Sequence, residues 1–264
     1  MDSGLSGTNV LITGASGGIG LAASRAFADE GAGLGLHFHL RPEPVRALAR
    51  ELDVPTALLG ADLRHEEQVD RLFDEAVAAL GPIDVVVVNA GIWDSSVSPV
   101  HRMTLRQWND TLEADLTSAF LTCRGFLRGL ADSPRERAAI VLVSSTAAVF
   151  GEADHADYAA AKAAIAYGLT RTLKNEIVRL APRGRVNAVC PGWTETPMAA
   201  GFSANPAEVA RATATMAMRK VAQPADVAAA IVYLASDRLA GHVSGQILTV
   251  AGGMEGRLLH GDLA

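Results

Sequence analysis

Short apolar runs alternate with helix-length stretches along all 264 residues, and this alternation constrains the fold more than any other feature. Most of the runs are apolar throughout, which is typical of parallel strands covered on both faces. Strands and helices in alternation predict a doubly wound parallel sheet with right-handed crossovers. We expect seven strands, at residues 9–13, 34–38, 56–59, 84–89, 139–144, 185–189 and 246–250.

Two of the stretches between these runs carry explicit helix signals. Between residues 69 and 80, apolar side chains recur at i, i+3, i+4 and i+7 spacing, and Gly81 ends the predicted helix. Thr104 and Gln107 have the spacing of a capping box, which predicts a helix from there to about Leu130. We therefore expect helices on both faces of the sheet.

The composition agrees with a single Rossmann-type domain over residues 1–264. Hydrophobic residues make up 49% of the chain and charged residues 20%, which is an ordinary globular balance. The net charge is -6 and the basic residues are scattered, so we expect neither a nucleic-acid partner nor a membrane partner. Cys123 and Cys190 lack metal-ligand spacing, and no secretory signal pattern is present. We expect buried reduced thiols, no bound metal and a cytoplasmic protein.

A glycine-rich turn follows the first predicted strand and opens a helix. Its glycines allow a tight turn and a close approach of the backbone to a pyrophosphate at the helix N-terminus. Because a strand and a helix flank the turn, we favour a dinucleotide site over a tight turn without a ligand. The predicted cofactor contacts here are Gly14, Ser16, Gly18, Ile19 and Gly20.

The ends of two later strands offer further contacts for a dinucleotide. Asp62-Leu63 follows the third strand and Asn89-Ala90-Gly91 follows the fourth. The carboxyl ends of parallel strands are where ligands bind in such sheets, so this position favours contacts to adenine and ribose. By identity alone, an aspartate or asparagine at a strand end is more often a turn former.

The end of the second strand bears on the choice of cofactor. Phe38 stands where an NAD enzyme places an aspartate for the ribose 2′-hydroxyl. His39 and Arg41 follow, and a guanidinium can hold a 2′-phosphate through two hydrogen bonds. We therefore expect NADP(H) to be favoured, with NAD(H) as the alternative. The competing interpretation is that Arg41 only faces water before Pro42.

Tyr158 and Lys162 form the most informative pair in the chain. At i, i+4 on a helix they share one face, and an ammonium beside a phenol lowers a phenol pKa that is about 10 in isolation. Such a phenol can serve as a general acid or base towards a substrate oxygen. Ser144-Ser145 ends the fifth strand, where a hydroxyl can orient that oxygen; a serine there is otherwise a simple cap.

In these features the chain closely resembles the short-chain dehydrogenase/reductase family, in the branch that includes 3-oxoacyl reductases. The resemblance implies that Tyr158 is the catalytic acid/base, that Ser145 positions the carbonyl, and that Lys162 holds the nicotinamide ribose while lowering the pKa of Tyr158. It also implies that Pro191, Gly192, Thr194 and Thr196 bind the carboxamide end of the nicotinamide. The motifs that carry it are Thr13-Gly14-x-x-x-Gly18-x-Gly20, Asn89-Ala90-Gly91, Ser145, Tyr158-x-x-x-Lys162, Asn187 and Pro191-Gly192.

The chain departs from the family pattern in two places. The family usually has an Asn-Leu-Thr-like run in its fourth helix, where this chain has Asp115-Leu116-Thr117. The family asparagine belongs to a proton relay that reaches the lysine, so we include Asp115 among the candidate catalytic residues. Near the C-terminus, Val-Asp-Gly-Gly is replaced by Val250-Ala251-Gly252-Gly253, a change that we expect to be structural.

The substrate is less constrained than the reaction, which is hydride transfer between nicotinamide and a carbonyl or alcohol carbon. Trp93 and Trp193, with Ser145 and Tyr158, are the predicted substrate contacts, although either tryptophan would also fit a core. A 3-oxoacyl reductase would dock an acyl-carrier protein on a basic face, but such a face can equally be only solvated. The arginines concerned are Arg128, Arg135 and Arg137.

Two other functions compete with a reductase or dehydrogenase. An epimerase or dehydratase that retains its cofactor needs a larger substrate region than the chain has after Gly192. A non-catalytic dinucleotide sensor would not need the serine, tyrosine and lysine together. The resemblance also implies a homotetramer, formed by the apolar faces of the helices that begin at Thr104 and at about Ala156 and by Leu258 and Leu259.

Overall fold

A single parallel sheet of seven strands forms the centre of the molecule. The computed structural model describes residues 2–94, 98–199 and 205–256. The strands lie in the order β3-β2-β1-β4-β5-β6-β7 and every neighbouring pair is parallel, as predicted. Their bounds are Asn9–Ile12 (β1), Gly33–Phe38 (β2), Thr56–Gly60 (β3), Val85–Val88 (β4), Arg137–Val143 (β5), Arg183–Pro191 (β6) and Ile247–Val250 (β7).

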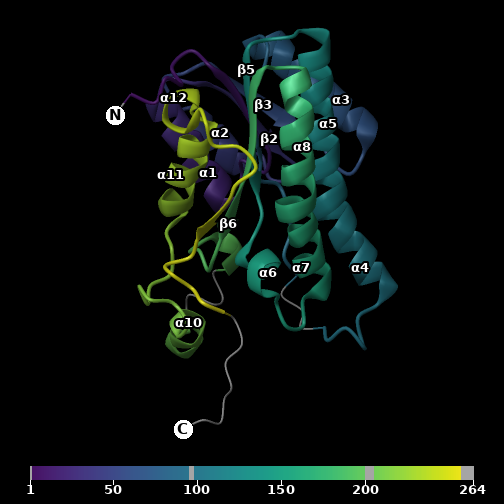
Figure 1. The fold of residues 1–264 in the computed structure, drawn as a ribbon, viewed down its shortest axis with the longest axis vertical. Helices are drawn as coiled ribbons and strands as arrows, with labels where there is room; N and C mark the ends of the chain where they lie inside the picture. The colour runs from purple at the N-terminus through teal and green to yellow at the C-terminus, as the bar shows by residue number, and fades with distance from the viewer. Residues whose placement is uncertain (1, 95–97, 200–204, 257–264) are drawn as a thin grey trace.

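Helices cover both faces of this sheet (Figure 1). One layer contains α1 (Gly18–Asp29), α2 (Glu43–Ala49), α11 (Pro224–Ala235) and α12 (Asp237–Ala240). The opposite layer contains α3 (Glu66–Leu80), α4 (Leu105–Leu112), α5 (Ser118–Asp132), α7 (Ala156–Ala163) and α8 (Thr170–Glu176). Two short helices, α6 (Thr146–Phe150) and α10 (Pro206–Thr213), lie near the end of the sheet where β5 and β6 finish. Among the described residues, no helix combines the length and the apolar character needed to cross a bilayer.

Two apolar clusters, one on each face, hold these layers together. Phe27 and Ile231 are fully buried between α1, α11 and the sheet, and Phe126 and Ile177 are buried on the opposite face. Burial of such a side chain contributes about 1.5–3 kcal/mol. Because both faces are covered, the apolar side chains of each strand are buried on either side, which explains the continuous apolar runs in the sequence.

Strand ends differ from the expected ranges where pairing continues further. β6 extends beyond 185–189 because Arg183 still pairs with Arg137 of β5, and Pro191 with Val250 of β7. The strand order reverses between β1 and β4, and the loops after these two strands leave a crevice at the carboxyl edge of the sheet.

The helix expected from Thr104 to about Leu130 is interrupted by a π-helical segment, Glu113–Thr117, between α4 and α5. The Thr104 hydroxyl caps α4 by accepting from the Gln107 N–H at 3.1 Å. The Gln107 side-chain amide donates to Asp157 of α7 at 3.2 Å. Gln107 therefore ties two helices together, a role that the capping-box pattern did not predict. A second π-helical segment, Ala164–Leu169, follows α7 directly.

Candidate functional site

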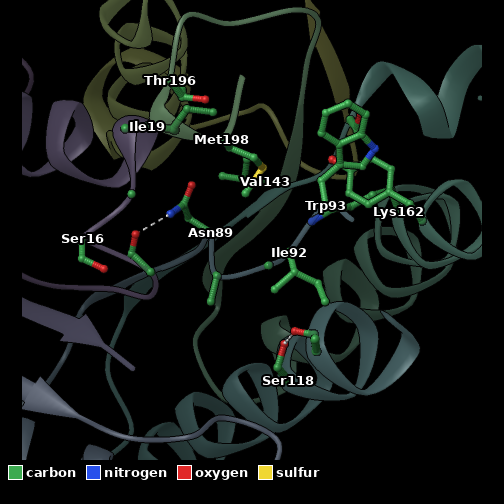
Figure 2. A pocket seen from close by; sticks show the side chains of 18 of the residues that line it. Ser16, Ile19, Asn89, Ile92, Trp93, Ser118, Val143, Lys162, Thr196 and Met198 are labelled. Atoms are coloured by element: carbon green, nitrogen blue, oxygen red, sulfur yellow. Dashed lines mark hydrogen bonds between the residues drawn. The ribbon is translucent and has the colours of Figure 1, made fainter. Parts of the chain in front are cut away.

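A pocket of about 880 Å³ lies at the carboxyl edge of the sheet (Figure 2). Ser16, Ile19 and Thr196 lie towards one end of the pocket, and Trp93 and Lys162 lie at the other. The predicted site residues that line it are Gly14, Ser16, Gly18, Ile19, His39, Arg41, Asp62, Leu63, Asn89, Ala90, Gly91, Trp93, Ser145, Tyr158, Lys162, Pro191, Gly192, Trp193, Thr194 and Thr196. Two predicted residues, Gly20 and Asp115, lie behind the wall that these residues form.

The glycine-rich turn is held so closely that three of its glycines, Gly14, Gly18 and Gly20, leave no room for a Cβ atom. Gly14 has φ +61°, which favours glycine, and a Cβ on it would lie 2.8 Å from the Ala90 Cα atom. A Cβ on Gly18 would lie 2.7 Å from the Thr196 side chain, and one on Gly20 only 2.3 Å from the Gly14 carbonyl oxygen. Gly20 thus packs the turn against α1.

Asn89 supports this turn from the end of β4. Its side-chain amide donates to the carbonyl oxygens of Thr13 and Gly14, at 3.0 and 3.1 Å. The Thr13 hydroxyl in turn accepts from the backbone N–H groups of Asn89 and Ala90, at 2.9 and 3.0 Å. The two loops on either side of the strand-order reversal are therefore fastened to each other, which positions the turn.

His37, a buried residue of β2, fixes the same turn from the other side. The Gly14 N–H donates to Nδ1 of His37 at 3.0 Å, and Nε2 lies 3.0 Å from the Ala61 carbonyl oxygen. Because Nδ1 accepts a hydrogen bond and Nε2 faces a carbonyl oxygen, the ring must be neutral and carry its proton on Nε2. Burial lowers the pKa of His37 to about 4. This role is not predictable from the sequence, because an isolated histidine within an apolar strand carries no signal beyond burial.

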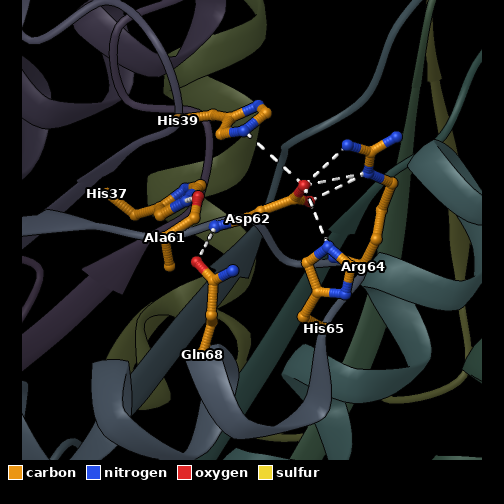
Figure 3. Close-up of polar contacts among 7 residues, drawn as sticks. All are labelled: His37, His39, Ala61, Asp62, Arg64, His65 and Gln68. Atoms are coloured by element: carbon orange, nitrogen blue, oxygen red, sulfur yellow. Dashed lines mark hydrogen bonds and ion pairs between the residues drawn. The ribbon is translucent and has the colours of Figure 1, made fainter.

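Asp62 is the centre of a charged cluster at one end of the pocket (Figure 3). Arg64 holds its carboxylate at 2.6 Å, and the His39 and His65 rings lie 3.6 and 3.5 Å from it. The hydrogen bond from Arg64 keeps the pKa of Asp62 well below its ordinary value. Arg64 lines the pocket but was not predicted; its spacing of two residues from Asp62 was the available signal.

Ser145 and Tyr158 lie together in the pocket wall, at the start of α6 and in α7. The Ser145 hydroxyl caps α6 by accepting from the Ala147 N–H at 3.1 Å, which leaves its own proton free to donate. Burial raises the pKa of Tyr158, while Lys162 and a hydrogen bond with Ser145 oppose that rise. Lys162 acts in the predicted direction, but burial outweighs it and the net shift is upward.

Lys162 and Asp115 form a buried ion pair behind Tyr158. The Lys162 Nζ lies 3.3 Å from Asp115 Oδ2 and 5.5 Å from the centre of the Tyr158 ring. Asp115 is fully buried, and its Oδ1 accepts from the Ile92 N–H at 2.7 Å. Burial raises the pKa of Asp115, and Lys162 opposes that rise. Burial lowers the pKa of Lys162, but Asp115 and Tyr158 together with Cys190 more than offset it, so its pKa is raised. The lysine is therefore held as an ammonium.

Three rings meet at the same end of the pocket. The Trp93 and His155 rings have centroids 5.2 Å apart, and those of Trp93 and Trp193 are 5.9 Å apart in an edge-to-face arrangement. Both tryptophans line the pocket, whereas His155 is buried behind Trp93.

Asn187, one of the motif residues, makes hydrogen bonds that hold the fold together. Asn187 joins β6 to the loop before β7, since its side chain donates to the Val243 carbonyl at 2.8 Å and accepts from the Gln246 N–H at 3.0 Å. Among the described residues, no group of three or more His, Cys, Asp or Glu side chains is placed to hold a metal ion. Leu258 and Leu259 lie outside the described residues.

The arginines considered for docking an acyl-carrier protein are each engaged by carboxylates. Arg128 pairs with Glu66 and Asp70, Arg135 with Asp84, and Arg137 with Asp237.

The chain is similar to known proteins over almost its whole length. A family model described as enoyl-(acyl carrier protein) reductase matches residues 14–255. The chain is 40% identical to cis-4-hydroxycyclohexanecarboxylate dehydrogenase of Sinomonas cyclohexanicum, over 92% of this chain and 94% of that protein. It is 37% identical to 3beta-hydroxysteroid dehydrogenase 1 of Eggerthella lenta, over 95% and 94%. It is 32% identical to a 3-oxoacyl-[acyl-carrier-protein] reductase of Synechocystis, over 92% and 95%.

Proposed function

This chain belongs to the short-chain dehydrogenase/reductase family, and from that premise we propose that Tyr158, Ser145 and Lys162 carry out its chemistry. It is an NAD(P)-dependent oxidoreductase that acts on CH–OH and C=O groups. The observation that carries the proposal is the placement of Tyr158 in the pocket wall beside Ser145, with the Lys162 ammonium 5.5 Å from its ring.

The pocket fits a nicotinamide dinucleotide, which supplies or accepts the hydride when bound. The N-terminus of α1 opens onto the pocket at Gly18 and has no acidic residue in its first turn, so its backbone N–H groups suit a pyrophosphate. Gly14, Ser16 and Ile19 would hold that pyrophosphate, and Gly20 would keep the turn closed. The fit rests on the turn itself, because Gly14, Ser16, Gly17 and Gly18 at the start of α1 all line the pocket.

The remaining cofactor contacts follow from their place along the pocket. His39, Arg41, Asp62 and Leu63 would meet the adenosine end, and Asn89, Ala90 and Gly91 the neighbouring ribose. Tyr158 and Lys162 would hold the nicotinamide ribose. Pro191, Gly192, Thr194 and Thr196 would meet the carboxamide end, with Thr196, which packs against Gly18, on the side nearest the pyrophosphate. All of these residues line the pocket.

Tyr158 would move the proton of the reaction. As a carbonyl carbon gains a hydride, its oxygen gains negative charge, and the phenol donates a proton to that oxygen. In the reverse direction the phenolate removes the proton of the alcohol. The Lys162 ammonium stabilises the phenolate and thus favours either transfer. Its own charge is secured by Asp115, which we propose as a positioning residue for Lys162.

Ser145 would orient the reacting oxygen. Its hydroxyl accepts from the Ala147 N–H, so the direction of its remaining proton is restricted. That proton can donate to the substrate oxygen as negative charge develops there. The two interpretations of a serine at a strand end, as a helix cap and as a catalytic donor, are therefore compatible in this residue.

We further propose that NADP(H) is the preferred cofactor. No acidic residue stands at position 38, where one would repel a 2′-phosphate, and Arg41 lines the pocket with an exposed guanidinium. Arg64 is engaged by Asp62 and is a weaker candidate for that phosphate. NAD(H) is the alternative.

We propose that the protein is a cytoplasmic homotetramer. The helix pair α4–α5 exposes Leu105 by 73% and Phe120 by 47%, and Tyr167 beyond α7 is exposed by 37%. Exposed apolar side chains on neighbouring helices are typical of an isologous interface, in which the same surface of two subunits meets. Both cysteines are free and buried, which suits a reducing compartment.

For the substrate, the relatives' names suggest two classes, alcohols on saturated rings and 3-oxoacyl groups. The pairing of Arg128, Arg135 and Arg137 with carboxylates disfavours docking of an acyl-carrier protein on that face. We therefore favour a small-molecule ketoreductase over a 3-oxoacyl reductase.

A reduction screen tests this function. Purified protein is incubated with NADPH or NADH and with keto esters, cyclic ketones, quinones, sugars or 3-oxoacyl thioesters, and loss of the reduced nicotinamide absorbance is followed. We expect turnover of at least one ketone class. A protein that binds NADPH but oxidises it with no carbonyl, while releasing no product from the corresponding alcohols, would support the non-catalytic sensor instead.

A further inference from the structure

We propose that the aromatic end of the pocket selects a ketone or secondary alcohol whose reacting carbon belongs to a saturated ring, packed against Trp93 and Trp193. The proposal rests on the function proposed above and names its substrate class. It starts from a concentration of aromatic side chains: the chain has three tryptophans, and two of them line this one pocket.

The rings come from three segments that also carry the reaction. Trp93 follows β4 and the Asn89-Ala90-Gly91 run, Trp193 follows β6, and His155 comes three residues before Tyr158. The Trp93 and His155 ring centroids are 5.2 Å apart, and Trp93, Tyr158 and Lys162 all line the pocket. A molecule in contact with the Trp93 ring therefore occupies the same pocket as the proposed proton donor.

Each tryptophan is held by its own surroundings. The backbone beside Trp93 is fixed because the Ile92 N–H donates to the buried Asp115 at 2.7 Å. Trp193 packs against Met216, Ala251 and Met254, a small apolar cluster separate from the two main cores. The loops thus present the rings in a defined geometry, which lowers the entropy cost of binding a rigid ligand.

Packing of the protein itself accounts for only part of this arrangement. Both tryptophans keep part of their surface exposed to the pocket, and Trp93 belongs to neither of the two large buried clusters. An edge-to-face pair leaves apolar ring surface uncovered in the pocket. Such a surface next to a polar reaction centre is typical of a ligand site in which apolar walls supply affinity and few polar groups set orientation.

A saturated ring matches this wall better than a linear chain does. Its C–H groups form a compact apolar body that can rest against an indole face, whose negative charge attracts the positive ends of C–H bonds. A cyclic ketone also has few rotatable bonds, so less conformational entropy is lost on binding. A 3-oxoacyl thioester is a flexible chain with a polar thioester group on one side of the reacting carbon, and the indole surfaces offer that group little hydrogen bonding.

Matched substrates and variants test the proposal. Initial rates with NADPH are measured for cyclohexanone, for 2-hexanone, which has the same number of carbon atoms, and for an acetoacetyl thioester. The variants are Trp93→Ala, Trp93→Phe, Trp193→Ala and the control Trp108→Phe, whose tryptophan lies on α4 outside the pocket lining.

We expect the wild-type kcat/KM for cyclohexanone to exceed that for 2-hexanone by about tenfold or more, as a difference of one aromatic contact allows. Trp93→Ala should bring the two values within about threefold of each other, chiefly through the KM for cyclohexanone. Trp93→Phe should restore most of the preference, and Trp108→Phe should not change it. Equal rates with both ketones, a preference for the thioester, or an equal loss for all substrates in Trp93→Ala would overturn the proposal.

A binding measurement separates this proposal from the proposed function. In Trp108→Phe only the two pocket tryptophans remain to fluoresce, so their emission is titrated with cyclohexanone and with 2-hexanone in the presence of NADP+. Saturable quenching by cyclohexanone at concentrations at least tenfold lower than those for 2-hexanone supports the ring site, even if no ketone is reduced. Turnover of ketones without this difference would uphold the oxidoreductase and refute the ring site.

Discussion

The two ends of the pocket handle charge in opposite ways. At the proposed adenosine end, Asp62, which is 13% exposed, meets His39 and Arg64, whose side chains are 45% and 42% exposed. At the reaction end, Lys162 and Asp115 are 6% and 0% exposed. Exposed pairs contribute about 0–1 kcal/mol because water screens them and competes for the same groups. A buried charge, in contrast, is strongly destabilising once its partner is lost, by about 3–5 kcal/mol.

This difference indicates what each end can be used for. The exposed end can accept a cofactor phosphate and release it again, since its charges remain solvated throughout. At the buried end, water does not screen the charges of Asp115 and Lys162. A change in the charge of either residue therefore alters the pKa of Tyr158. Substitutions should therefore have large effects near Tyr158 and modest, salt-dependent effects near Asp62.

Tyr158→Phe should have the largest effect, because it removes the proposed proton donor and leaves the pocket shape intact. We expect kcat to fall by about 10²–10⁴-fold, as is typical for loss of a general acid. NADPH affinity, measured by fluorescence titration, should fall far less than kcat, by a few-fold at most, because the phenol is only one of the proposed contacts with the cofactor. Tyr167→Phe, a matched loss of a hydroxyl on a tyrosine outside the pocket lining, should leave both values unchanged. Near-normal turnover in Tyr158→Phe would exclude the proposed mechanism.

Acid should destabilise the fold through His37, a buried histidine of β2 whose pKa is strongly lowered in the folded protein. Its pKa is about 4 in the folded protein against 6.5 in the unfolded chain, so the unfolded chain binds the proton first as the pH falls. Stability from this group is complete above pH 6.5 and is lost between pH 6.5 and about 4, by about 3 kcal/mol in total.

Urea unfolding at pH 5 and at pH 7.5 measures this effect. The difference in the free energy of unfolding between the two pH values should be smaller in His37→Gln than in the wild type. His101→Gln, which changes an exposed histidine, should retain the wild-type difference. If the wild type and His37→Gln lose stability in parallel, His37 is not the group that titrates.

Arg41→Ala tests the exposed end. We expect kcat/KM to fall by about tenfold with NADPH and to remain within about twofold with NADH, since only the first offers a 2′-phosphate for charge-assisted hydrogen bonds. Added salt should weaken wild-type binding of NADPH more than that of NADH. Arg46→Ala on α2 is the control for loss of an exposed guanidinium nearby. A wild-type enzyme that works as well or better with NADH would refute the preference for NADP(H).

Asp115→Asn should have the smallest effect of the four on activity and is the most specific test of the buried end, although it leaves the buried Lys162 ammonium without its carboxylate and should lower the free energy of unfolding by about 3–5 kcal/mol. An ionised Asp115 raises the pKa values of Lys162 and Tyr158, so its replacement by the neutral amide should lower both. The kcat/KM profile against pH should move to lower pH by up to about one unit, with activity retained. Asp132→Asn, on the exposed end of α5, should not move it. Superimposable profiles would make Asp115 a structural substitution.

The sequence predicted the sheet well because its strands are buried on both faces. Uninterrupted apolar runs such as 85–88 have few alternatives in an α/β pattern, and the short-range pair Tyr158 and Lys162 is visible as a spacing on one helix. Features that depend on distant partners were not accessible in the same way. His37 and Gly14 are 23 residues apart, and Gln107 and Asp157 are 50 apart, so no local pattern connects them.

The pocket residues show the same division. The glycine-rich turn was recognised, but not that Asn89 fastens it, because a strand-end asparagine signals only a turn until its partner is known. The rise in the pKa of Tyr158 could not be predicted from the sequence either, since it is caused by burial and opposed by the lysine four residues away.

The π-helical segment Glu113–Thr117 has a consequence for how this chain tolerates insertions and deletions. Each residue of an α-helix advances the chain by about 100°, so deleting one residue in this segment would allow a regular helix but rotate α4 by about that angle relative to α5. Gln107 and Thr111 would then turn away from Asp157, to which both now donate. The length of this helix is therefore as constrained as its side chains, and natural variation in chain length should fall in the loops on either side of it.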